Sequence, residues 1–251
     1  MKEQLHTIPV NEAFESGDEC PFCYLERQVE QRTLRYAIGP GASYMEPEIR
    51  EITNREGFCR EHLKMMYDYG NALGNALILQ TYFLYMMEQL DAQMDNYELP
   101  EKKSLFRRKK QETPKDTMVP WLEEKLSSCF ICKQIEENMS RYYATFYALI
   151  KEPEFREKVE GSKGFCMRHF LELMQRSEDY LPEKQRQWFR EKVFSVQWEN
   201  LNRVKDDLDW LIKKYDYRYA GEDWKNSRDA LRRAMQKYQG GHPADGPYKD
   251  L

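Results

Sequence analysis

The sequence predicts an all-α fold, a helical bundle made of two tandem repeats and closed by a C-terminal capping helix. Glycine and proline are scarce, with 12 and 11 in 251 residues, which disfavours an all-β fold with its many turns. Apolar residues recur at steps of three and four over long stretches, the period of a helix that buries one face. A six-residue motif also occurs twice, as GFCREH at 57–62 and GFCMRH at 164–169.

Other features repeat in the same order. CPFC at 20–23 corresponds to CFIC at 129–132, and EPEIRE at 46–51 corresponds to EPEFRE at 152–157. Matched features in one order indicate an internal duplication. The predicted organisation is an N-terminal repeat at 1–100, a basic linker at 101–118, a C-terminal repeat at 119–215, a capping segment at 216–240 and a disordered tail at 241–251.

Each CxxC is predicted to begin a helix. Pro21 directly follows Cys20, and proline is favoured at the first helical position. In the second repeat the apolar stripe of this helix is Ile131, Ile135, Met139, Tyr142, Phe146 and Leu149. Pro47 and Pro153 are predicted to begin a short helix in each repeat by the same rule.

The histidine end of each motif is predicted to open a longer helix. In the first repeat its stripe is Leu63, Met66, Gly70, Leu73, Leu77, Leu84 and Met87. In the second repeat a helix over roughly 186–214 carries Phe189, Val193, Val196, Leu201, Val204, Leu208 and Leu211. The capping helix is predicted to use Ser227, Leu231, Ala234 and Tyr238 as its inner face.

All six cysteines and two of the four histidines fall in these motifs. Each repeat reads C-x2-C, a gap of 35 or 33 residues, and then C-x2-H. Residues three positions apart lie on the same side of a helix, so the cysteine and the histidine of each CxxH can bind one ion together. The predicted ligand sets are Cys20, Cys23, Cys59 and His62 in the first repeat, and Cys129, Cys132, Cys166 and His169 in the second.

A complete Cys3His set is typical of structural zinc, whose closed shell leaves no position for water or substrate. The sequence therefore predicts two zinc ions per chain in a metal-binding scaffold or interaction protein. The alternative is a redox or electron-transfer protein, with iron–sulfur clusters or reactive dithiols at the same cysteines. No P-loop, GxSxG, HExxH or dinucleotide motif is present, so no catalytic residue is predicted.

Charge and hydropathy narrow the choice of partners and compartment. The net charge is −4, and the basic run at 102–115 is read as a solvated linker rather than a nucleic-acid contact. The most apolar stretch, 72–87, is shorter than the ~18–20 residues that a membrane span needs. The N-terminus shows no secretory signal, and a cytoplasmic location, where thiols stay reduced, is expected. An unknown protein partner is compatible with the scaffold reading.

The stretch YDYRYAGEDW at 215–224 permits two interpretations. Asp216, Arg218 and Trp224 could line a binding groove. The favoured interpretation is a segment that folds back on the bundle, with Arg218 paired and Trp224 packed, since buried aromatic rings contribute strongly to core stability.

Over about residues 8–240 the chain resembles an uncharacterised bacterial family of unknown function. The resemblance is carried by IPVNEAFESGDECPFC, by the paired GFCxxH motifs and by the closing DYRY, Trp224 and KYQG. It implies a small cytoplasmic protein with duplicated Cys/His sites. The family has no assigned activity, so the resemblance implies no catalytic residue.

Overall fold

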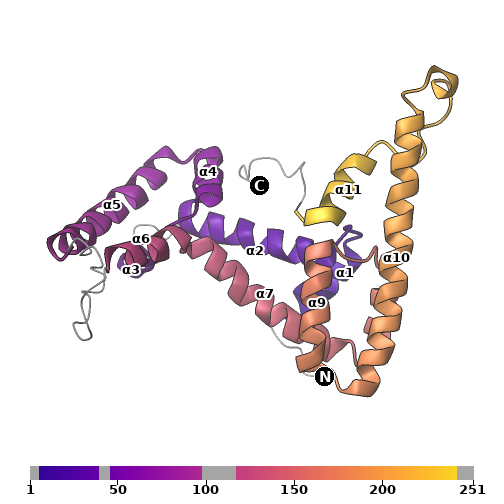
Figure 1. Ribbon diagram of the computed structural model, residues 1–251, viewed down its shortest axis with the longest axis horizontal. Coiled ribbons are helices and arrows are strands. Elements are labelled where there is room, and N and C mark those ends of the chain that lie inside the picture. Colours follow the sequence, from indigo (N-terminus) through magenta and orange to yellow (C-terminus); the bar gives the residue numbers. More distant parts are fainter. Residues whose placement is uncertain (1–5, 40–45, 98–116, 242–251) are drawn as a thin grey trace, which may run out of the picture. The chain divides into compact units, whose positions relative to one another are not determined.

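The computed structural model describes residues 6–39, 46–97 and 117–241. Within these ranges the chain forms eleven α-helices and one turn of 3-10 helix, Tyr217–Tyr219, and no strand (Figure 1). The predicted all-α fold is confirmed. The basic run at 102–115 and the tail from 242 onward lie outside the described residues.

The described residues divide into two compact units. One unit contains the residues up to Glu30 and those from Ile135 onward, and the other contains Gln31–Gln134. The divisions fall inside two helices, α2 (Pro21–Ile38) and α7 (Phe130–Leu149). The units therefore differ from the predicted repeats, because each unit takes residues from both halves of the chain.

The first unit contains the larger core. Besides the start of α2 and most of α7, its helices are α1 (Thr7–Glu15), α8 (Pro153–Glu160), α9 (Met167–Tyr180), α10 (Glu183–Lys213) and α11 (Ala230–Gln239). Aromatic rings dominate the interior: Phe22 stacks on Tyr143 with ring centroids 4.5 Å apart, and Phe146 meets Phe189 edge-on. The predicted buried face of the long second helix is confirmed at Phe189, Val193, Val196 and Val204.

The second unit contains the end of α2 and the first turn of α7. Its other helices are α3 (Pro47–Glu56), α4 (Arg60–Tyr69), α5 (Ala72–Asp95) and α6 (Met118–Ser127). Helix α5 packs against α3, α4 and α6. Its buried residues are only Gly74 and Ile78, so this unit has a thinner core than the first.

One predicted helix is broken in two. The expected continuous helix through Leu63 and Met87 ends at Tyr69, because Gly70 takes a left-handed conformation with φ of 90°. Such a glycine is a common helix terminator. Asn71 then caps α5, since its side chain accepts a hydrogen bond of 2.9 Å from the Gly74 N–H. On α5 the predicted stripe is largely exposed, at Leu73, Leu84 and Met87.

The two halves of the chain still pass through the same order of elements. A helix begins at the CxxC (α2 or α7), and a short helix begins at a proline (α3 or α8). A helix then follows the GFC (α4 or α9), and a long helix comes after it (α5 or α10). No helix in the described ranges is both long enough and apolar enough to cross a membrane.

Candidate metal centres

The eight predicted ligand residues gather into two groups. We call the group of Cys20, Cys23, Cys166 and His169 the buried site, and the group of Cys59, His62, Cys129 and Cys132 the exposed site. In each group the four candidate ligand atoms lie within 4.8 Å of one another. Each group has three thiols and one imidazole, the donor set of a Cys3His metal site.

The predicted assignment of ligands to sites was wrong. Sequence spacing suggested that each CxxC meets the CxxH of its own half, but each CxxC meets the CxxH of the other half. Helix length supplies a physical reason. Cys23 is the third residue of the 18-residue helix α2, and the rest of that helix carries the chain about 22 Å along its axis before it reaches Cys59. Cys59 and His62 therefore join Cys129 and Cys132, and all four belong to the second unit.

The buried site has the geometry of a shell around a single ion. His169 Nδ1 lies 3.4 Å from the Sγ atoms of both Cys20 and Cys23. It lies 3.2 Å from Cys166 Sγ, and the Sγ atoms of Cys23 and Cys166 are 3.6 Å apart. Tetrahedral zinc, with bonds of about 2.3 Å to sulfur and about 2.0 Å to nitrogen, separates sulfurs by about 3.8 Å and sulfur from nitrogen by about 3.5 Å.

The exposed site repeats this geometry. His62 Nδ1 lies 3.2 Å from Cys59 Sγ, 3.3 Å from Cys129 Sγ and 3.4 Å from Cys132 Sγ. The Sγ atoms of Cys59 and Cys132 are 3.8 Å apart. Both histidines thus present the same ring nitrogen to three sulfurs.

The local fold of each GFC-x2-H explains why these atoms converge. Gly57 and Gly164 have φ of 63° and 77°, a region that favours glycine, and they turn the chain into the motif. Cys59 and Cys166 then stand as extended N-cap residues of α4 and α9. The histidine three residues later lies in the first helical turn. Helix N-termini favour negative charge, so thiolates are stabilised there.

Sequence reasoning missed a glutamine that holds the buried motif in place. Gln197 on α10 is buried and donates a 2.9 Å hydrogen bond to the carbonyl oxygen of Phe165. Its Oε1 accepts a 2.9 Å hydrogen bond from the Phe165 N–H. Both backbone polar groups of Phe165, the residue directly before Cys166, are thus held by hydrogen bonds. Gln197 directly follows the buried Val196 in the sequence. The prediction used only the spacing of apolar residues, which does not identify a buried glutamine.

A carboxylate and a guanidinium surround the far side of His169. Its Nε2 lies 3.7 Å from Glu26 Oε2, and Arg168 forms two hydrogen bonds with the same carboxylate, one of them 2.9 Å long. An imidazole that gives Nδ1 to a metal carries its proton on Nε2. Glu26 Oε2, at 3.7 Å, is beyond hydrogen-bond distance of this nitrogen, and Arg168 Nη2 lies nearer to it, at 3.3 Å. The carboxylate therefore supplies negative charge beside the ring rather than a hydrogen bond that fixes the tautomer.

The ligand groups shift one another's proton affinities. Burial lowers the pKa of His169, but hydrogen bonds and negative charge from Cys166 and Cys20 outweigh it and raise that pKa to about 10. Hydrogen bonds from Cys20 and Cys23 hold the pKa of Cys166 far below its ordinary value. At the exposed site, burial raises the pKa of Cys129, but hydrogen bonds led by His62 lower it to about 6. Thiolates this close together repel one another unless protons or a cation lie between them. A bound cation displaces the protons.

The two sites differ in their contact with solvent. In the buried site Cys20 and Cys166 are 0 % exposed, His169 is 1 % exposed and Cys23 is 2 % exposed. In the exposed site His62 and Cys129 are buried, Cys59 is half-buried and Cys132 is exposed. Two similar ligand shells thus have different access to reagents.

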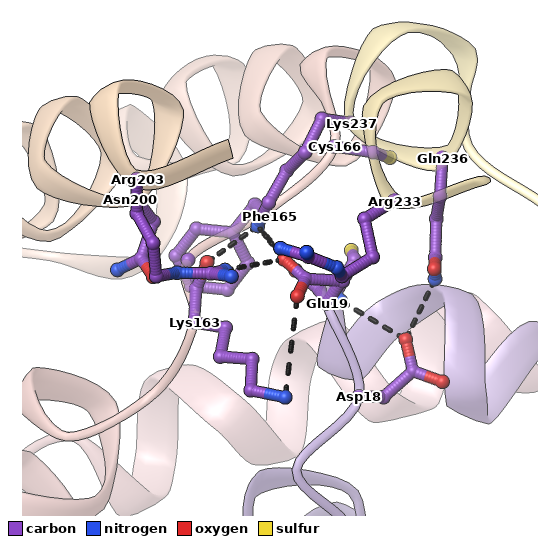
Figure 2. A network of polar contacts seen from close by, with 12 residues as sticks. Asp18, Glu19, Lys163, Phe165, Cys166, Asn200, Arg203, Arg233, Gln236 and Lys237 are labelled. Carbon is purple, nitrogen blue, oxygen red and sulfur yellow. Dashed lines mark hydrogen bonds and ion pairs between the residues drawn. The ribbon is translucent and has the colours of Figure 1, made fainter. Parts of the chain in front are cut away.

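Helix α11 covers the buried site with polar side chains (Figure 2). The predicted inner face was wrong at Leu231 and Tyr238, which are 53 % and 71 % exposed. The buried face instead contains Arg233, Gln236 and Lys237. Polar residues are tolerated in this position because each of them has charged or hydrogen-bonding partners.

Two of these side chains reach the residues just before Cys20. Gln236 donates a 2.6 Å hydrogen bond to Asp18 Oδ1, and the same oxygen accepts one of 3.0 Å from the Cys20 N–H. Lys237 Nζ donates 2.5 Å to the carbonyl oxygen of Glu19 and also binds the carbonyl of Lys163. The C-terminal helix is thereby tied to both loops that supply ligands to the buried site.

A buried carboxylate extends this network. Glu19 is 5 % exposed and lies among three cations, shown together in Figure 2. Its Oε2 is 2.6 Å from Arg203 and 3.4 Å from Lys237, and its Oε1 is 4.0 Å from Lys163. Opposite charges at these distances offset the cost of burying the carboxylate.

The 215–224 stretch matches the packing interpretation only in part. It forms a turn at the end of α10 rather than folding back on the bundle, and Tyr215 and Tyr217 are 85 % and 87 % exposed. Arg218 pairs with Asp216 at 2.6 Å. Lys214 on the preceding turn donates to the carbonyl of Tyr219 at 2.7 Å and lies over the ring of Trp224. These contacts hold the segment against the end of α10.

A model of a family described as "Family of unknown function (DUF6062)" matches residues 1–245. Comparisons with curated proteins and with solved structures give no match. The family match spans both Cys/His groups and the C-terminal helix that covers one of them. The chain therefore belongs to the family of unknown function DUF6062.

Proposed function

We propose that the chain is a zinc-binding helical scaffold with one structural zinc ion in each Cys3His group. The observation that supports this most directly is the spacing of ligand atoms: in both groups the histidine Nδ1 lies 3.2–3.4 Å from all three sulfurs, and all four ligand atoms lie within 4.8 Å of one another. Spacing of this size is that of a tetrahedral shell around one ion. All eight ligands are cysteine or histidine, the donors that zinc prefers in structural sites.

The competing proposal, a redox protein with iron–sulfur clusters, requires a different spacing. The cysteines of a cluster bind different iron atoms with bridging sulfides between them, so their sulfurs spread apart. In both groups all ligand atoms lie within 4.8 Å. This closeness favours a single ion over a cluster, so iron–sulfur clusters are the weaker candidate.

The proposed role of each ion is to join segments that are distant along the chain. At the buried site the ion would link the start of α2 to the start of α9, with Cys20 and Cys166 separated by 145 intervening residues. At the exposed site it would link the start of α4 to the start of α7. Structural zinc contributes directly to folding free energy, on the order of 10 kcal/mol in small domains. We also propose that the matched order of elements reflects duplication, and that the protein works in the cytoplasm, where free thiols persist.

Elemental analysis of protein made without a histidine tag tests the metal. The expected result is two zinc ions per chain, with no visible colour. Replacement of zinc by cobalt(II) should give the strong visible absorption of a tetrahedral thiolate site. A brown protein that contains iron and labile sulfide would contradict the zinc proposal and support the clusters. Protein with neither metal after aerobic and anaerobic preparation would overturn both.

A further inference from the structure

We propose that Cys59 and Cys132 form an oxidation site, at which peroxide converts the two thiolates to a disulfide and expels the metal ion. This inference rests on the proposed function for the ion and for the thiolate state of the pair, but not for the exposure and closeness of the two sulfurs. The observation that supports it is that the two sites have the same donor atoms and similar spacing, whereas their cysteines differ in exposure to solvent. The reagent class is a small peroxide, with hydrogen peroxide as the probe.

Access selects Cys132 as the sulfur that reacts first. Cys132 is exposed, whereas the other cysteine of its CxxC, Cys129, is 4 % exposed. Oxidation of cysteine follows thiolate character and access. A zinc-bound sulfur is a thiolate, and Cys132 combines that state with contact to solvent.

Exposure then favours Cys59 as the partner, because the Sγ atoms of Cys59 and Cys129 both lie within 4.8 Å of Cys132 Sγ but Cys129 is only 4 % exposed. Cys59 Sγ lies 3.8 Å from Cys132 Sγ, and Cys59 is half-buried rather than sealed. The two residues stand at the starts of different helices, since Cys59 is the N-cap of α4 and Cys132 lies in the first turn of α7. A bond between them would keep these helix starts joined after the ion has left.

The chemistry balances with one peroxide as the oxidant. The Cys132 thiolate attacks one peroxide oxygen, the O–O bond breaks, and sulfenic acid and hydroxide are formed. The Cys59 thiolate then attacks the Cys132 sulfur, the S–S bond forms, and the S–O bond breaks to release a second hydroxide. Two thiolates lose two electrons in total, and one peroxide becomes two waters after taking two protons. The ion keeps only His62 and Cys129 as ligands and dissociates.

The buried site supplies the internal comparison. Its four ligands are at most 2 % exposed, and α11 packs against α9, the helix that contains His169. A Cβ added to Gly240 would lie 3.2 Å from Cys166 Sγ, which shows how closely the end of α11 approaches this sulfur. Peroxide should therefore reach these thiolates much more slowly.

The test uses full-length protein with its metal, exposed to hydrogen peroxide in the presence of a colour-forming zinc chelator. One ion should leave at least tenfold faster than the other. Disulfide mapping by mass spectrometry should find Cys59 joined to Cys132 before any other pair. The variant Cys59→His keeps a possible ligand but removes the partner sulfur, so it should abolish this disulfide and slow the release of the first ion. Its matched control, Cys166→His at the buried site, should leave the Cys59–Cys132 disulfide unchanged.

Two outcomes would overturn the inference. One is release of both ions at the same rate, and the other is first oxidation at Cys20, Cys23 or Cys166. Protein isolated without metal would count against the proposed function alone, because disulfide mapping of the same sample still decides whether Cys59 and Cys132 are the pair that oxidises first.

Discussion

The ammonium group of Lys237 donates a hydrogen bond of 2.5 Å to the carbonyl oxygen of Glu19, although the two residues are 218 positions apart. Glu19 directly precedes Cys20, and Lys237 is 3 % exposed. A buried lysine is costly unless its charge and its hydrogens find partners. These partners are the backbone carbonyls of the ligand loops, so the C-terminal helix and the buried site stabilise each other.

Replacing this lysine should loosen the buried site. Lys237→Met leaves the Glu19 and Lys163 carbonyls without their shared donor and weakens the cationic surroundings of the Glu19 carboxylate. Breaking a buried charged contact costs about 3–5 kcal/mol. The buried ion should therefore pass to a chelator at least tenfold faster, while release from the exposed site stays unchanged. Arg232→Met on the exposed side of α11 is the control, and equal rates in the two variants would refute the stabilising role of Lys237.

Gly240 offers a second way to disturb the same site. Its φ is 82°, and an added Cβ would meet Cys166 Sγ at 3.2 Å. Gly240→Val should therefore combine backbone strain of about 1–3 kcal/mol with a steric conflict at a metal ligand. We expect lower zinc occupancy at the buried site, measured by native mass spectrometry.

The neighbouring glycine separates these two effects. Gly241 also has a positive φ, 67°, but an added Cβ there meets nothing within 4 Å. Gly241→Val should cost similar strain without touching Cys166. If both variants lower zinc occupancy equally, contact with Cys166 is not the cause.

The sequence was sufficient to predict the all-α class, the helices that begin at each CxxC and each EPE, and the eight candidate ligands, because these depend on local spacing. It did not predict α1 or α6, and it missed the break at Gly70. Cys59 and His62 share a helix start, as do Cys166 and His169, and each CxxC lies in one turn. The partnership between motifs is a long-range property. The gaps of 35 and 33 residues between each CxxC and the next CxxH are compatible with pairing within a half or between halves. Because both halves contain the same two motifs, the sequence does not show which CxxC shares an ion with which CxxH.

The inner face of α11 was missed for a different reason. Hydrophobic periodicity pointed to Leu231 and Tyr238, whereas the helix buries Arg233, Gln236 and Lys237. Those three residues have the i, i+3, i+4 spacing of one helical face. The polar stripe was therefore visible in the sequence, but its carbonyl and carboxylate partners become apparent only when distant segments are brought together.

Metal removal should proceed in two stages. A mild chelator reaches the exposed site through Cys132, whereas the buried site opens only when α11 moves or the unit unfolds. We expect one zinc to leave promptly with little loss of helical circular dichroism. The second zinc should leave only in denaturant, together with the main loss of helicity. Simultaneous loss of both ions without denaturant would contradict the difference in access.

The exchange of ligands between halves makes a prediction that distinguishes the two pairings directly. Cys20→Ser combined with Cys166→Ser damages only the buried site, so one zinc ion should remain. Cys20→Ser combined with Cys59→Ser damages both sites, so zinc content should fall to nearly none. Pairing within each half requires the opposite pattern, because Cys20 and Cys59 would then share one ion and Cys20 and Cys166 would not. The two double variants carry the same number of Cys→Ser changes and share one of them, so general destabilisation affects them alike. Zinc content per folded chain, with circular dichroism to confirm folding, therefore decides which cysteines hold each ion.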